Sequence, residues 1–87
     1  MKPGTQVDRF GWDTGRFVAP NGTSIGARSL APGTTDKPYK VFEVTNRLVV
    51  HAGLAQPWFG QPGMGTQYCL PASVGDLLDA GYLRTVG

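Results

Sequence analysis

Alternation of apolar and polar residues is clearest over residues 39–45, where β-branched and aromatic side chains predominate. Successive side chains of a strand point to opposite faces, so Lys40, Phe42 and Val44 share one face of this predicted strand. Shorter extended patterns, several of them bounded by turn residues, cover residues 5–10, 16–19, 47–51, 66–70 and 82–86. The pattern predicts a sheet of short strands, with residues 82–86 at an edge.

A single well-marked helix is predicted after Ser73. Ser73 can cap it, Asp76 stands three residues later to complete a capping box, and Gly81 supplies a left-handed stop. The helix carries one apolar stripe that is expected to pack on the sheet, formed by Val74, Leu77 and Leu78.

Length and turn content restrict the fold further. The 87 residues include 13 glycines and 7 prolines, which leaves little room for long helices. Residues 24–30 are expected to form one helical turn capped by Ser24, and residues 31–38 a loop. We therefore predict one α+β domain over residues 1–87, made mainly of short antiparallel strands with one C-terminal helix.

Charge and cysteine content argue against several classes of function. Eight basic and six acidic residues give a net charge of +2 without a cluster, so nucleic-acid binding is not expected. Cys69 is the sole cysteine, which rules out an internal disulfide, and nothing in the sequence places it beside His51, the sole histidine. We expect Cys69 to be a small buried hydrophobe. No run approaches the roughly 18–20 apolar residues of a membrane span.

The most distinctive segment is PWFGQPGMGTQY, residues 57–68, which carries no charge. Glycines allow the backbone to approach a ligand closely, while Trp58, Phe59 and Tyr68 offer flat apolar walls. The segment is typical of a pocket wall. A tight turn held by its own aromatic side chains is the alternative.

This segment resembles the PWFGQPGGGTQY signature of the tuberculosis necrotizing toxin family of small secreted NAD glycohydrolases. Upstream, VDRFG at residues 7–11, GRF at 15–17 and RSL at 28–30 are similar to that family in order and spacing. The resemblance implies hydrolysis of NAD or NADP to nicotinamide and ADP-ribose, with no cofactor. It also implies a toxic domain of a longer secreted or delivered effector, with a cognate immunity protein as partner; no signal peptide follows Met1.

The same resemblance assigns roles to individual residues. Gln67, the glutamine of GTQY, is implied to be catalytic at the nicotinamide ribose. Arg9 of DRFG is implied to act on the diphosphate, which a planar guanidinium can bind through two donors at once. The remaining expected substrate-binding residues are Phe10 and Phe17 at the nicotinamide, Arg28 and Lys40 at the phosphates, and Gly11 and Thr66. Asp8 can alternatively hold Arg9 in an exposed ion pair.

Two positions depart from the family pattern. Met64 replaces a glycine, and because methionine avoids positive φ we expect the loop to shift or to present Met64 outward. An outward Met64 would be available to an immunity partner, and Met64→Gly is expected to cost about 0.5–1 kcal/mol. Lys40 stands at or near a position where some members carry a functional histidine.

Two other functions remain open from the residues alone. The aromatic loop can belong to a catalytically silent module that binds a peptide or sugar. The domain can also be an ADP-ribosyltransferase, a class that often uses a glutamate, although Glu43 is the sole glutamate and is predicted to lie on a strand. The chain has no convincing carboxylate pair of the kind many glycosidases use.

Overall fold

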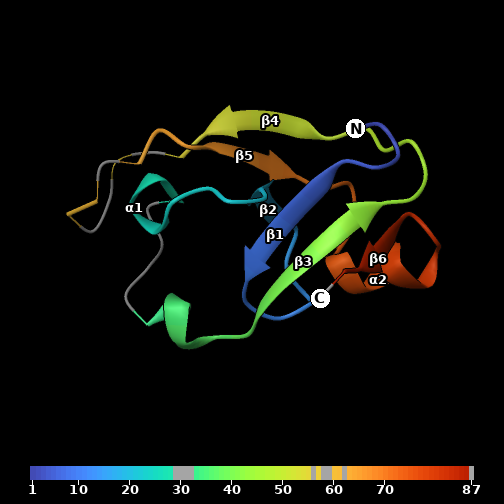
Figure 1. The fold of residues 1–87 in the computed structure, drawn as a ribbon, viewed down its shortest axis with the longest axis horizontal. Coiled ribbons are helices and arrows are strands. Elements are labelled where there is room, and N and C mark those ends of the chain that lie inside the picture. Colours follow the sequence, from blue (N-terminus) through green and yellow to red (C-terminus); the bar gives the residue numbers. More distant parts are fainter. Residues whose placement is uncertain (29–32, 56, 58–59, 62, 87) are drawn as a thin grey trace.

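A six-stranded antiparallel sheet organises the chain (Figure 1). The computed structural model describes residues 1–28, 33–55, 57, 60–61 and 63–86. The strands are β1 (Gln6–Phe10), β2 (Phe17–Pro20), β3 (Tyr39–Val44), β4 (His51–Leu54), β5 (Thr66–Cys69) and β6 (Leu83–Thr85), and they lie in the order β4-β5-β2-β1-β3-β6. Two short α-helices, α1 (Ile25–Arg28) and α2 (Val74–Asp79), and a 3-10 helix, η1 (Thr34–Asp36), complete the described elements.

Strand β2 joins two parts of the sheet. Its first residues, Phe17 and Val18, pair with β5, whereas Ala19 and Pro20 pair with β1. The β4–β5 pair consequently runs at an angle to the β1–β3 pair, as Figure 1 shows. The predicted α+β fold of short antiparallel strands with a C-terminal helix is confirmed.

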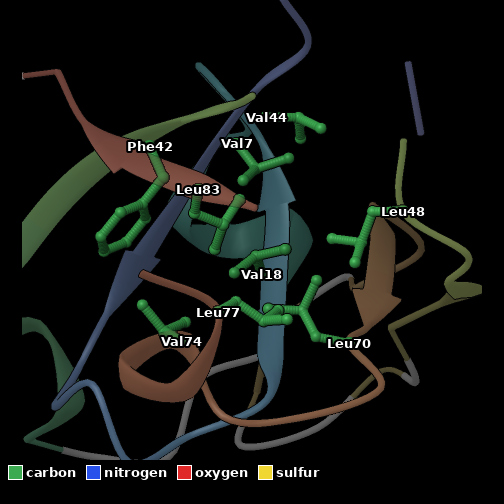
Figure 2. Close-up of a cluster of buried hydrophobic side chains, with 9 residues drawn as sticks. All are labelled: Val7, Val18, Phe42, Val44, Leu48, Leu70, Val74, Leu77 and Leu83. Carbon is green, nitrogen blue, oxygen red and sulfur yellow. The ribbon is translucent and has the colours of Figure 1, made fainter. Parts of the chain in front are cut away.

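The core lies between one face of the sheet and α2 (Figure 2). Alternation along the strands directs one apolar set toward this helix, and the buried cluster comprises Val7, Val18, Phe42, Val44, Leu48, Leu70, Val74, Leu77 and Leu83. Helix α2 begins as predicted, because the Ser73 side chain accepts a hydrogen bond from the Asp76 N–H at 3.1 Å. Gly81 follows the helix at φ 83° and ends it as predicted.

The strand predicted over residues 47–51 is wrong, because β4 begins only at His51. Residue Leu48 is instead 4% exposed and packs in the core. Its backbone pairs with the first residue of the chain: the Leu48 N–H donates to the Met1 carbonyl at 3.0 Å, and the Met1 amino group donates to the Leu48 carbonyl. Ala52 and Gly53, which have low strand propensity, gave no signal for β4.

The helical turn expected over residues 24–30 is observed in its described part as α1. Ser24 caps α1 through its hydroxyl, which accepts from the Ala27 N–H at 3.2 Å. Helix α1 is described from Ile25 to Arg28, and the last two residues of the expected turn lie outside the described residues. The predicted loop over 31–38 contains η1. Over the described part of the chain, no helix has the length and hydropathy to cross a membrane.

Candidate active site

A pocket of about 70 Å³ opens on the sheet face opposite the core. Alternation along β1 turns Val7 toward the core, and therefore Asp8 and Phe10 toward the other face. The residues lining the pocket come from β1, β2, α1 and β5 and the segment before it: Asp8, Arg9, Phe10, Phe17, Val18, Ala19, Arg28, Ala55, Thr66 and Gln67. The structure thus brings six of the eight predicted site residues together.

Gln67 reaches the pocket from β5. Its register partner on β4 is Gly53, which has no side chain. A Cβ placed on Gly53 would meet no atom within 4 Å, so the space at this position of β4 is open. The glutamine side chain is half-buried and makes no hydrogen bond to any of the residues described. Its amide is therefore free to donate to or accept from a ligand.

A buried carboxylate organises the opposite wall. Asp8 is fully buried, and its Oδ1 lies 2.7 Å from Nη1 of Arg28, whose side chain is 7% exposed. This ion pair is close but poorly aligned, so Oδ1 accepts no well-formed hydrogen bond within the described chain. Oδ2 accepts from the Tyr39 hydroxyl at 2.7 Å and from the Gly22 N–H at 3.2 Å. The expected exposed pair of Asp8 with Arg9 is therefore wrong: the carboxylate is buried and pairs with Arg28.

The Asp8 network fixes the orientation of two neighbours. Arg28 also donates from Nε to the Thr23 carbonyl at 2.9 Å. The hydrogen bond to Asp8, followed by burial, raises the pKa of Tyr39, because both disfavour the phenolate. Arg28 is thus held as a directed donor whose charge Asp8 already compensates.

Phe10 and Phe17 offer different surfaces to a ligand. The Phe10 ring is engaged by the protein: the Arg28 guanidinium carbon lies 5.2 Å from its centroid, and the Tyr39 ring centroid lies 4.7 Å away at 45°. Phe17 is 51% exposed at the pocket. Phe17 therefore has aromatic surface open to a flat ligand.

Backbone carbonyls hold the Arg9 side chain. Its Nε donates to the Trp12 carbonyl and its Nη1 to the Phe17 carbonyl, both at 2.9 Å. Burial lowers the pKa of Arg9, and the nearby charge of Asp13 acts in the opposite direction. Arginine has five N–H donors, and these two bonds use two of them among the residues that the structure describes.

Lys40 and Gly11 do not join this pocket. Lys40 is the register partner of Arg9 on β3, so alternation places it on the other face from Asp8 and Phe10. Both residues line a separate cavity of about 480 Å³, where Lys40 Nζ lies 3.3 Å from Asp13 Oδ2. Lys40 and Gly11 therefore line a different cavity from the other six predicted site residues.

Met64, in the segment 57–68, adopts a left-handed backbone conformation with φ 65°, although methionine disfavours it. Its N–H donates to the Ala55 carbonyl at 2.6 Å, and the next N–H, of Gly65, donates to the Ala27 carbonyl at 3.0 Å. These bonds fix the loop and leave Met64 58% exposed, as the outward alternative predicted. Trp58 and Phe59 lie outside the described residues.

Three features of the site were missed by sequence reasoning. Asp8 shares a face of β1 with Phe10, and that alternation was the available signal for its place in the pocket. The partnership of Tyr39 with Asp8 spans 31 residues and had no local signal. Cys69 is half-buried and stands opposite both Phe17 and His51 in the sheet register, a proximity that the sequence did not reveal.

The fold and the pocket define a small antiparallel α+β domain whose binding site combines arginine, aromatic and amide side chains. Within the part of the chain that the structure describes, no group of three or more His, Cys, Asp or Glu residues could hold a metal ion. The chain belongs to the tuberculosis necrotizing toxin family, whose model matches residues 1–86. The resemblance found in the sequence is confirmed.

Two relatives give the family match more detail. The chain is 44% identical over 88 residues to the conidial surface nicotinamide adenine dinucleotide glycohydrolase nadA of Aspergillus fumigatus, covering 93% of this chain and 38% of that protein. The solved structure of tuberculosis necrotizing toxin complexed with its immunity factor IFT superposes with a TM-score of 0.81 at 26% identity, covering 92% of this chain and 47% of that one. The chain spans less than half the length of each.

Proposed function

We propose that this domain hydrolyses NAD+ or NADP+ at the bond between nicotinamide and ribose. The observation that carries the proposal is that one pocket is lined by an amide, a hydroxyl, two arginines and two phenylalanines: Gln67, Thr66, Arg9, Arg28, Phe10 and Phe17. Membership of the family and the 44% identity to a named NAD glycohydrolase support the same reaction.

The pocket suits a reaction that needs orientation and charge stabilisation. Nicotinamide leaves as a neutral base, so it needs no protonation, and positive charge develops on the ribose. Water adds its oxygen to the anomeric carbon and loses one proton to solvent, which yields ADP-ribose. The Gln67 amide can hold a ribose hydroxyl and this water, while Phe17 stacks on the nicotinamide and Arg9 and Arg28 face the phosphates. Asp8 supports Arg28 and is too buried and too engaged to act as a nucleophile.

Glu43 argues against the transferase alternative. Its carboxylate lies 3.0 Å from the Arg84 side chain, and neither residue lines the pocket. A glutamate positioned at the nicotinamide ribose would be needed for the usual transferase chemistry. Hydrolysis is the reaction that the pocket residues support.

The biological role follows from the relatives as a proposal. One relative is a conidial surface enzyme and the other a toxin complexed with its immunity factor. We infer that this domain acts within a longer secreted or delivered effector and that a cognate immunity protein binds it. Binding of a purified candidate immunity protein should abolish nicotinamide release at a one-to-one ratio, and hydrolysis that continues in a formed complex would contradict this role.

The reaction can be tested with NAD carrying a label on the adenine side. Purified domain should release nicotinamide and free labelled ADP-ribose, whereas labelled protein would identify a transferase and absence of product a silent module. Gln67→Ala should lower kcat by about 10²–10³, the usual effect of removing one transition-state hydrogen-bond partner, without changing the melting curve. The matched control is Gln6→Ala, because Gln6 is exposed and its amide oxygen accepts a hydrogen bond from the Asn21 side chain, outside the pocket. Equal kcat in both variants would refute the role of Gln67.

A further inference from the structure

The Arg9 guanidinium occupies the space that a side chain at residue 15 would need. A Cβ built on Gly15 would lie 1.9 Å from Arg9 Nη2 and 2.2 Å from its Cζ, far inside any allowed contact. At Gly11 the corresponding distance to Nη2 is 3.0 Å. The guanidinium is therefore enclosed between two glycines, with residue 15 the more restrictive.

Backbone hydrogen bonds to residues outside loop 11–16 hold it in place, so its backbone resists displacement. The carbonyls of Asp13 and Gly15 accept from the N–H groups of Gly75 at 2.8 Å and Val74 at 3.0 Å, at the start of α2. The Arg16 carbonyl accepts from the Leu70 N–H at 2.8 Å. These three hydrogen bonds tie the loop to the segment that carries the core residues Leu70 and Val74.

Backbone conformation does not require glycine at residue 15. Gly11 has φ 136°, a region that other residues avoid, but Gly15 has no positive φ. Alanine therefore fits the backbone there, and the three atoms nearest to its Cβ all belong to the Arg9 guanidinium. Since the loop is anchored and the guanidinium is the far end of a flexible side chain, Arg9 is the group that must move.

We propose that Gly15 is a positioning residue for Arg9. Its missing side chain admits the guanidinium, and the anchored loop presents the Trp12 carbonyl that fixes its direction. Trp12 accepts both the Arg9 Nε–H at 2.9 Å and the Gly15 N–H at 3.2 Å, so the loop and the arginine share one acceptor. Through this arrangement the start of α2, on the core side of the sheet, sets the orientation of an arginine at the pocket.

A double-mutant cycle of Gly15→Ala and Arg9→Ala tests the proposal, which rests on the proposed function for its kinetic arm. Displacing Arg9 should lower kcat/KM about 10–100-fold in Gly15→Ala, in line with the effect of misplacing a reacting group by about 1 Å. In the Arg9→Ala background the same change should alter kcat/KM by less than about twofold, because no guanidinium remains to be displaced. The matched control is Gly75→Ala, whose added Cβ would make an ordinary 3.4 Å contact with the Asp13 carbonyl.

Thermal melts of the same four proteins supply a second arm that does not depend on activity. Gly15→Ala should lower Tm when Arg9 is present, since two hydrogen bonds to carbonyls are lost, and should leave Tm unchanged or higher in Arg9→Ala. Equal shifts in both backgrounds, in kcat/KM or in Tm, would overturn the proposal and make Gly15 a purely structural residue. If the wild-type domain released no nicotinamide, the proposed function would fail, and the Tm cycle alone would still support or overturn the positioning role.

Discussion

Removing one partner of the buried Asp8–Arg28 pair should strongly destabilise this domain. In Asp8→Asn the amide oxygen still accepts from the Tyr39 hydroxyl, but the Arg28 charge, with 7% of its side chain exposed, loses its counter-charge. Breaking one partner of a buried pair typically costs about 3–5 kcal/mol. A domain of 87 residues has a total stability of roughly 4–13 kcal/mol, at about 0.05–0.15 kcal/mol per residue. The substitution therefore removes a large share of it.

Thermal or urea unfolding followed by circular dichroism measures this effect. At about 4–8 °C per kcal/mol for a domain of this size, Tm should fall by roughly 12–40 °C. The double variant Asp8→Asn with Arg28→Met removes both charges and should recover most of the loss, because a buried pair replaced by uncharged groups is often neutral. An unchanged Tm in Asp8→Asn, or a double variant no more stable than the single one, would refute the account of this network.

Three further predictions concern the pocket and its surroundings. Arg9→Lys should raise KM for NAD, because one ammonium cannot reproduce both carbonyl contacts and the fork of a guanidinium, and steady-state kinetics indifferent to the change would contradict a diphosphate role. Met64→Gly should be neutral or gain up to about 1.5 kcal/mol in thermal melts, because relief of a left-handed methionine, about 1–2 kcal/mol, equals or exceeds the entropic cost of glycine, about 0.5–1 kcal/mol. A clear loss of Tm would refute this. The folded-state pKa of Tyr39 is raised, so its hydrogen bond to Asp8 should contribute fully to stability below about pH 10 and be lost as pH rises through that raised value. The Tm difference between wild type and Tyr39→Phe should therefore be smaller at about pH 11 than at about pH 8. An equal difference at the two pH values would contradict this contribution.

Local patterns predicted the parts of the fold that depend on neighbouring residues. The alternation of Lys40, Phe42 and Val44 gave β3 with its correct faces, and the Ser73 cap and the Gly81 stop gave α2. The Met1–Leu48 pairing, 47 residues apart, shifted β4 away from the predicted range. Such pairings depend on tertiary contacts that no window of sequence contains.

In the candidate site, too, local motifs predicted some residues, whereas the position of others depends on tertiary contacts. Family motifs named Gln67, Arg28 and Phe17, and the fold brings these residues to one pocket. Motifs could not tell that Lys40 lies on the sheet face away from Asp8 and Phe10, because that follows only from the register of β3 against β1. Nor could they show that Asp8 pairs with Arg28, since the two residues lie 20 positions apart in the sequence and meet only in the folded domain.

The short strand β1 has consequences for how this domain can evolve. Val7 fills the core, Asp8 holds Arg28, Arg9 occupies the space beside Gly15, and Phe10 supports the guanidinium of Arg28. Each of these four consecutive residues thus has a separate structural role, two on each side of the sheet, so substitution of any of them should be costly. All four residues of β4 are exposed, and none of them is packed in the core. Sequence divergence among functional descendants should therefore accumulate along β4 and be almost absent from β1.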